Sequence, residues 1–189
     1  SASWSKNPIR AKTDHRHTVT NKSFVRPLLE TAATAWNPWK RGDVEKLEKV
    51  QRRCLRLVDG LKKLPYEKRL EELDLQLLEN RRERGDLIQC FKYLNGYNDV
   101  CPDQVFTFVR DRHDKLTRSF VNNNLVAEKT SLDVRKYFFA NRVTGAWNSL
   151  PLDVRLASSV NSFKNKYDAF IKLNVHRDWD CRYARVCQY

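Results

Sequence analysis

Apolar residues return at three- and four-residue steps along most of this chain, a spacing that favours α-helix over other regular structure. The clearest stretch begins at Asp43, a candidate N-cap, and ends at the helix-stopping pair Asp59-Gly60. Its apolar stripe consists of Val44, Leu47, Val50, Cys54 and Leu57. We expect this stripe to face the core, and the opposite side of the helix to be a solvated surface with the i,i+4 pairs Glu45–Lys49 and Glu48–Arg52.

The same period predicts helices elsewhere in the chain. They are expected over residues 23–37, 65–73, 77–94 and 133–150, and after Asn161. Val105–Val109 is β-prone, Leu116–Val121 is less clearly so, and Asn122–Asn124 is typical of a turn. The predicted fold is therefore a mainly α single domain, a bundle of four to five helices with an irregular or short β-hairpin insert.

Composition divides the chain into five segments. Residues 1–22 are polar and basic with few aliphatic side chains, so we expect a flexible basic arm. Residues 23–96 form the helical bundle, 97–131 the irregular insert, 132–173 the C-terminal helices and 174–189 a tail without periodicity.

Positive charge dominates the sequence and is unevenly distributed. The formal net charge is +13, of which residues 1–42 carry +6, residues 43–104 carry none and residues 105–189 carry +7. Such a balance favours a polyanionic partner.

Other features bound the location of the protein. No apolar run approaches the roughly 20 residues that a bilayer requires, so no membrane partner is expected. The N-terminus has no initiator Met and no signal segment, and it is typical of a fragment or a processed start. Five scattered cysteines do not suggest a disulfide framework, so we expect an intracellular protein, in nucleus or cytoplasm, with Cys54 and Cys90 as buried small hydrophobic residues.

Basic clusters on the predicted helices are candidates for contacts with phosphates, because arginine matches phosphate oxygens in pairs and lysine offers a point charge. In the charge-balanced middle, a solvated face paired with acidic neighbours is the competing interpretation. In the C-terminal part, where Arg110, Arg112, Lys115 and Arg118 also face few acids, phosphate contact is favoured. The candidate nucleic-acid-binding residues are Arg52, Arg53, Arg56, Lys62, Lys63, Arg81, Arg82, Arg135, Lys136 and Arg142.

Aromatic residues at helical spacing are expected in the core. They are Trp36, Phe138, Phe139, Trp147, Phe163 and Phe170. Trp39, Trp179 and Tyr183 lie off these stripes and are the candidates for stacking on bases.

Motifs that carry chemistry are weak or missing. His176, Cys181 and Cys187 lack the short Cys-x2-Cys spacing that presets a tetrahedral zinc site, so no metal site is predicted. The sequence has no Gly-rich phosphate loop, no His-Glu-x-x-His and no Gly-x-Ser-x-Gly motif. We therefore assign no catalytic residue and expect no cofactor in this chain.

Several short motifs follow one another in the chain. They are Arg-Pro-x-Leu-Glu from Arg26, Trp-x-Pro from Trp36, Leu-Glu-x-Val-Gln-Arg-Arg from Leu47, Asn-Arg-Val from Asn141 and Trp-Asn-x-Leu-Pro from Trp147. As a set, in this order and within residues 23–173, they resemble the region after the palm in reverse transcriptases of non-LTR retrotransposons (LINE-type, CR1/Jockey-like).

In that family this region is the helical thumb and the part C-terminal to it, which clamp the template-primer duplex. The resemblance implies a thumb-like bundle over residues 23–96 and a parent RNA-directed DNA polymerase. The catalytic carboxylates of that polymerase, with a divalent metal such as Mg²⁺, belong to an Asp-Asp motif in the palm. No Asp-Asp pair occurs in this sequence, so we expect this chain alone to be inactive.

Two functions follow from these observations. The first is binding of RNA or RNA–DNA duplex by the thumb and C-terminal part of a reverse transcriptase, beside the palm and fingers domain of the parent. The alternative is an orphaned helical protein-interaction module from a decayed or domesticated element copy, with Phe24, Leu28 and Trp36 as its apolar surface.

Overall fold

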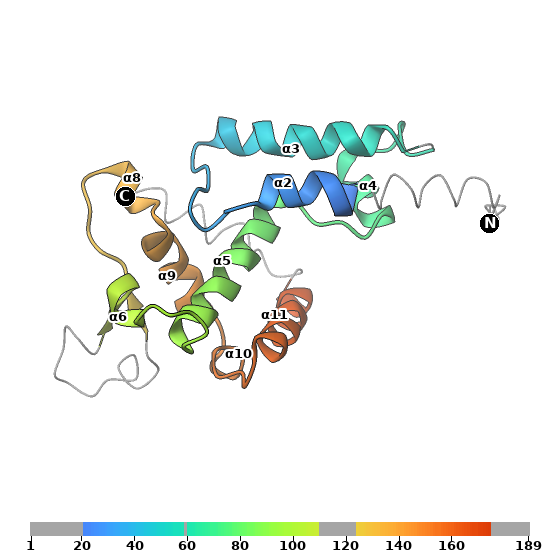
Figure 1. Cartoon of the computed structure of the whole chain (residues 1–189). Helices are drawn as coiled ribbons and strands as arrows, with labels where there is room; N and C mark the ends of the chain where they lie inside the picture. Colours follow the sequence, from blue (N-terminus) through green and yellow to red (C-terminus); the bar gives the residue numbers. More distant parts are fainter. Residues whose placement is uncertain (1–20, 59, 110–123, 175–189) are drawn as a thin grey trace. The chain divides into compact units, whose positions relative to one another are not determined.

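The computed structural model describes residues 21–58, 60–109 and 124–174 of the chain (Figure 1). The chain divides into two compact units between Asp86 and Leu87, and this boundary falls inside one helix, α5 (Leu78–Leu94). Helices dominate the described residues, and the strands among them form a single two-stranded antiparallel sheet. The predicted mainly α class with a short β-hairpin is confirmed.

The first unit contains one turn of π-helix and a set of α-helices. These are η1 (Asn21–Val25), α2 (Arg26–Glu30), α3 (Arg41–Arg56), α4 (Tyr66–Glu72) and the first half of α5. Its core cluster consists of Leu55, Tyr66, Leu70 and Leu75, with Leu73 packed against it. Helix α3 ends at Arg56, with Leu57 still in the right-handed helical region, so the predicted stop at Asp59-Gly60 lies too far along the chain; Gly60 has a φ of 86° in the turn that follows.

The helix predicted over residues 23–37 is wrong in its second half, because regular helix ends at Glu30. Thr31 Oγ1 donates to the carbonyl oxygen of Pro27 at 2.6 Å, and the indole Nε1 of Trp36 donates to the carbonyl oxygen of Thr31 at 3.0 Å. These side chains satisfy backbone acceptors that a continuing helix would use. Ala32 then takes a positive φ of 52°, and the chain turns.

Helix α3 buries a different face from the one that its apolar residues predict. Glu48, Gln51 and Leu55 are buried, whereas Val50 and Leu57 of the predicted core stripe are exposed. Cys54 is only partly buried, so its predicted burial is not complete. The helix also begins at Arg41, two residues before the predicted N-cap, and Asp43 lies within its first turn.

The second unit combines the rest of α5 with short helices and the sheet. Its further elements are α6 (Pro102–Val105), β1 (Thr107–Phe108), β2 (Leu125–Val126), α8 (Asp133–Lys136), α9 (Phe139–Ser149), α10 (Leu152–Arg155) and α11 (Val160–Asn174). In the sheet, Thr107 lies opposite Val126 and Phe108 opposite Leu125. The other predicted β-prone stretch, residues 116–121, lies outside the described residues.

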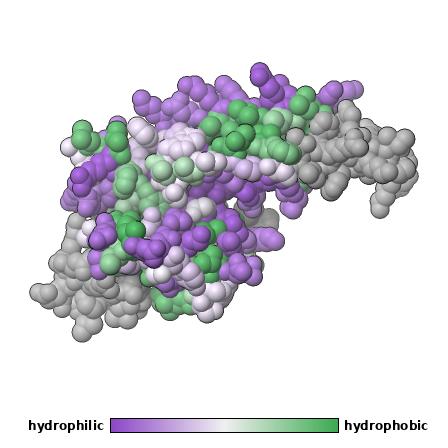
Figure 2. All heavy atoms as spheres, viewed as in Figure 1, coloured by the Kyte–Doolittle hydropathy of each residue, from purple (hydrophilic) through white to green (hydrophobic). Residues whose placement is uncertain are grey.

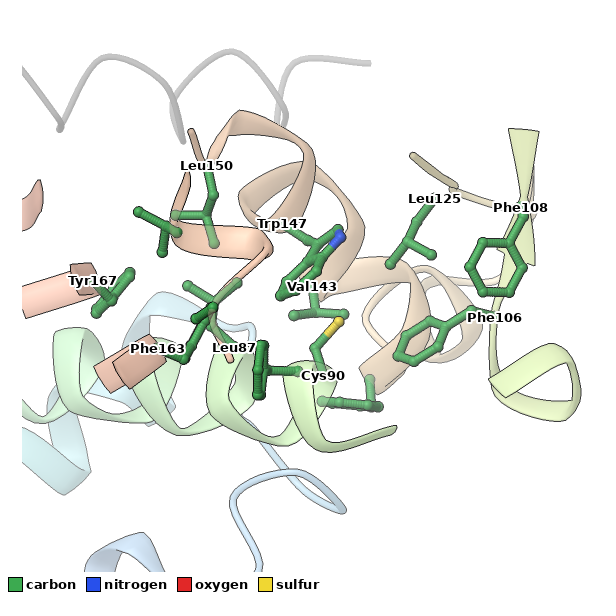
Figure 3. Close-up of a cluster of buried hydrophobic side chains, with 14 residues drawn as sticks. Leu87, Cys90, Phe106, Phe108, Leu125, Val143, Trp147, Leu150, Phe163 and Tyr167 are labelled. Atoms are coloured by element: carbon green, nitrogen blue, oxygen red, sulfur yellow. The ribbon is translucent and has the colours of Figure 1, made fainter. Parts of the chain in front are cut away.

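Aromatic side chains fill the core of the second unit, where residues from α5, α9, α11 and the sheet point toward one another (Figure 3). The ring centre of Phe163 lies 4.6 Å from that of Phe91 and 6.0 Å from that of Trp147. Cys90 is buried here, as predicted. The predicted burial of Phe139, Trp147 and Phe163 is confirmed.

The helix predicted over residues 133–150 is two helices. Phe138 is extended, with φ −60° and ψ 151°, and precedes the first residue of α9. This break takes Val134 and Phe138 off the buried stripe, so both are exposed. Phe138 and Trp36 are therefore not core residues, contrary to the sequence prediction, and Phe170 is partly buried at the edge of the core.

Candidate nucleic-acid interface

Four of the predicted basic residues follow one another closely at the end of α3 and in the turn after it. Arg53 and Arg56 belong to the last turn of the helix, and Lys62 and Lys63 follow within seven residues of Arg56. All four side chains are exposed. Among the described residues, no carboxylate lies within ion-pair distance of any of them. We call this set the α3 basic end.

A buried arginine that the sequence analysis missed holds the turn of the α3 basic end in place. Arg69 of α4 donates through Nε to the carbonyl oxygen of Leu61 and through Nη2 to that of Lys62, both at 2.9 Å. Its guanidinium thereby supplies a donor to the carbonyl oxygen of Lys62 and a second donor to that of Leu61, which also accepts from the backbone N–H of Leu64 at 3.0 Å. The only signal in the sequence is an arginine close to the apolar Leu70 on a short helix.

Arg52 faces inward rather than toward the α3 basic end. Its guanidinium carbon lies 4.8 Å from the ring centre of Tyr66, and the side chain is partly buried. The predicted pair with Glu48 does not form, because the Glu48 carboxylate has other partners. Glu45 and Lys49 do approach each other, at 4.0 Å.

A buried polar network fixes α3 against α4 and the start of α5. Glu48 accepts a hydrogen bond from the hydroxyl of Tyr66 through Oε1, and from the backbone N–H of Leu78 through Oε2 at 3.1 Å. Gln51 Nε2 donates to the Tyr66 hydroxyl and to the carbonyl oxygen of Gln76, each at 3.1 Å. Burial, and then the hydrogen bond to Glu48, raise the pKa of Tyr66 above its ordinary value. This network explains why a helix can bury polar residues.

Arg81 and Arg82 of α5 hold α2 and the segment after it, and do not extend the α3 basic end. Arg81 Nη2 donates to Glu30 Oε2 at 2.9 Å. Arg82 is buried and donates to the backbone carbonyl oxygens of Leu29 and Trp36. A phosphate ligand must face solvent, so the position of Arg82 does not fit the role assigned to it from sequence.

A further arginine, Arg26, lies buried beside this group. Its Nε is 3.6 Å from Glu30 Oε1. Burial and the charge of Arg81 lower the pKa of Arg26, while Glu30 opposes that shift. Glu30 thus serves two guanidiniums, and the cluster stabilises the fold of the first unit.

In the second unit, the three predicted cations have local partners. Arg135 Nη2 lies 3.0 Å from Glu128 Oε2 on an exposed surface, a pair that stabilises by under about 1 kcal/mol. The Lys136 ammonium lies 5.6 Å from the ring centre of Tyr137. Arg142 donates to the carbonyl oxygen of Tyr137 at 3.3 Å. Arg110, Arg112, Lys115 and Arg118 lie outside the described residues.

Most of the candidates for base stacking and metal binding lie outside the described residues. Trp39 is exposed, whereas Trp179 and Tyr183 lie outside the described residues. So do His176, Cys181 and Cys187, and within the described ranges no three His, Cys, Asp or Glu side chains are grouped as metal ligands would be. Nor is any helix in those ranges both long and apolar enough to cross a bilayer.

Comparisons of this chain with family models, curated proteins and solved structures found no match.

Proposed function

We propose that this chain binds RNA or RNA–DNA duplex through phosphates, as the template-primer-binding thumb and C-terminal part of a non-LTR retrotransposon reverse transcriptase. The observation that carries this proposal is the α3 basic end, four exposed cations without a carboxylate partner among the described residues. The net charge of +13 supports a polyanionic partner. The order of motifs in residues 23–173 supports the polymerase parent.

The geometry suits contact with a backbone rather than with bases. Arg53 and Arg56 are three residues apart and lie on one face of α3. The turn that carries Lys62 is held by Arg69, so the lysines are presented next to the end of the helix. Phosphate contacts of this kind fix position on a duplex and carry no sequence information. The palm and fingers domain of the parent would be the protein partner and would supply the Asp-Asp motif and Mg²⁺.

A second candidate function, a helical protein-interaction module, is favoured by a separate observation. Phe24, Leu28 and Trp36 are all exposed in the first unit. Figure 2 shows hydrophobic residues gathered over α2 and the adjoining part of α3. Exposed apolar patches on a protein surface typically mark interaction sites.

Binding of the full chain to a fluorescently labelled RNA–DNA hybrid, measured by anisotropy over a series of salt concentrations, tests the first function. If the α3 basic end neutralises phosphates, the logarithm of the binding constant falls linearly with the logarithm of salt, by about 0.9 per phosphate contacted. Weak binding that does not change with salt would overturn the nucleic-acid function and leave the interaction module.

A further inference from the structure

Helix α3 carries three parallel stripes of residues at steps of three, four and three. The buried stripe is Glu48, Gln51, Leu55 and, just beyond the helix, Val58. The apolar stripe is Leu47, Val50, Cys54 and Leu57. The basic stripe is Lys46, Lys49, Arg53 and Arg56. Each residue advances a helix by about 100°, so the apolar stripe lies between the core on one side and the basic stripe on the other.

The apolar stripe alternates between partly buried residues, Leu47 and Cys54, and exposed ones, Val50 and Leu57. Val50 is 43% exposed and Leu57 is 59% exposed. Helix η1 contacts α3 and carries Phe24, which is 68% exposed, and Leu28 of α2 is 77% exposed. Figure 2 shows a hydrophobic surface over α2 and the adjoining part of α3. We call Phe24, Leu28 and the apolar stripe together the α3 apolar face.

The charge at the edge of this face selects its partner. Lys46 already pairs with Asp43 at 2.8 Å, and Lys49 lies 4.0 Å from Glu45. Arg53 and Arg56 have no carboxylate partner within the described part of the chain. An apolar surface edged by guanidiniums is complementary to an apolar surface edged by carboxylates. A second copy of this chain is not complementary to this face, because its matching face carries the same basic stripe and like charges would meet.

We infer that the α3 apolar face docks an amphipathic helix of another protein, with apolar residues along one side and Asp or Glu along the edge that meets Arg53 and Arg56. The distance from Leu47 to Leu57 corresponds to about 15 Å of helix, which matches roughly three turns of a docked helix. Docking of this kind is read through apolar anchors at helical spacing. The inference deepens the interaction-module function and does not require nucleic-acid binding.

A pair of synthetic helical peptides tests the inference. Both carry leucine along one face over four turns; one has glutamate at the flanking positions and the other has lysine there. In anisotropy titrations with the full chain, we expect the glutamate peptide to bind at least about tenfold more tightly than the lysine peptide, with a preference that shrinks as salt rises. Equal binding of the two peptides, or no binding of either, would overturn the inference.

Variants of exposed residues assign the binding to this face. Val50→Ser and Leu57→Ser are each expected to lower the affinity for the glutamate peptide by about tenfold, because each removes an apolar anchor. Neither variant should change the midpoint of thermal unfolding. Val134→Ser is the matched control, since Val134 is also an exposed apolar residue on a helix, but in the second unit. An equal loss in Val134→Ser would overturn the assignment.

Two further measurements separate this surface from other occupants and from the nucleic-acid function. The serine variants should leave binding of the RNA–DNA hybrid unchanged. Arg53→Ala should weaken binding of both the hybrid and the glutamate peptide. Self-association of the chain that Leu57→Ser abolishes would assign the face to a second copy. Binding to anionic vesicles without binding to the peptide would assign it to a lipid surface, and either result overturns the proposal.

Discussion

The guanidinium of Arg82 lies over the indole ring of Trp36, with 4.2 Å between the guanidinium carbon and the ring centre. The same side chain donates to Asn37 Oδ1 at 3.0 Å and to two backbone carbonyl oxygens. One arginine thus closes the segment that follows α2 onto α5, and the packing of that segment depends on it.

Arg82→Ala is expected to lower the free energy of unfolding by about 2–4 kcal/mol, because buried carbonyl groups lose charge-assisted donors. Urea denaturation followed by circular dichroism measures the change. Arg53→Ala is the control, since Arg53 is exposed, and its effect should stay within about 0.5 kcal/mol. Equal effects of the two variants would contradict the structural role of Arg82.

Stability should fall at alkaline pH through Tyr66. The folded state keeps its phenol protonated above the pKa of an unfolded tyrosine, about 10, because burial and the bond to Glu48 raise the pKa of Tyr66. The contribution is therefore full below pH 10 and is lost progressively as pH rises above it. Denaturation midpoints measured across this range should fall less steeply for Tyr66→Phe than for the unchanged chain. Parallel pH profiles for the two proteins would argue against the network.

Truncation of Phe163 should destabilise the protein strongly and truncation of Phe138 should not, although the spacing of both residues predicts that they lie in the core. Phe163 is fully buried between Phe91 and Trp147, so Phe163→Ala should destabilise the second unit by about 3–5 kcal/mol. Phe138 is exposed, and Phe138→Ala should change stability by no more than about 0.5 kcal/mol. Thermal unfolding of the two variants decides the point, and a large loss for Phe138→Ala would place that ring in a core.

Substitution of Gly85, inside α5, and of Gly96, just after its end, by alanine should change the stability of the protein in opposite directions. Gly85 lies inside the helix with no atom within 4 Å of an added Cβ, so Gly85→Ala should stabilise by up to about 1 kcal/mol. Gly96 has a φ of 69° after the last turn, so alanine there is strained and should destabilise by about 1 kcal/mol. Unfolding midpoints of the two variants, measured side by side, test this; a shift in the same direction for both would be inconsistent with the backbone geometry.

Removal of two charges from the α3 basic end should change the salt dependence of hybrid binding. Arg53→Ala with Arg56→Ala is expected to reduce the slope of log binding constant against log salt by about 1.8, since each phosphate contact contributes about 0.9. Lys46→Ala with Lys49→Ala removes the same charge from lysines that already approach carboxylates, and should reduce the slope less. Identical slopes for the two double variants would show that net charge alone, and not the α3 basic end, drives binding.

Local patterns predicted those elements whose ends depend on neighbouring residues. Helix α5 begins one residue from its predicted start and ends at its predicted end, Leu94; Gly96, with a φ of 69°, follows the last turn. Helix α4 begins directly after Pro65, which cannot donate but is well suited to the start of a helix. In these cases short-range stereochemistry decides the structure, and the sequence displays it.

Partners distant in the chain account for most of the differences. In the sequence, Glu48 is typical of a residue that faces solvent. In the structure it is buried, because Tyr66 and the N–H of Leu78, 18 and 30 residues away, supply its hydrogen bonds. The inward position of Arg82 depends in the same way on carbonyl groups more than 40 residues earlier. Periodicity cannot reveal such pairings, so it predicted that α3 would bury its apolar stripe and that Arg82 would face a phosphate.

The division between the two compact units inside α5 determines how this protein can be dissected. A fragment that stops at Asp86 would retain only nine residues of α5, and an isolated helix shorter than about 12 residues is marginal in water. A fragment that starts at Leu87 would expose the severed end of the same helix beside buried Cys90 and Phe91. Fragments expressed separately should therefore begin or end in the loops that flank α5, so that each fragment contains the whole helix.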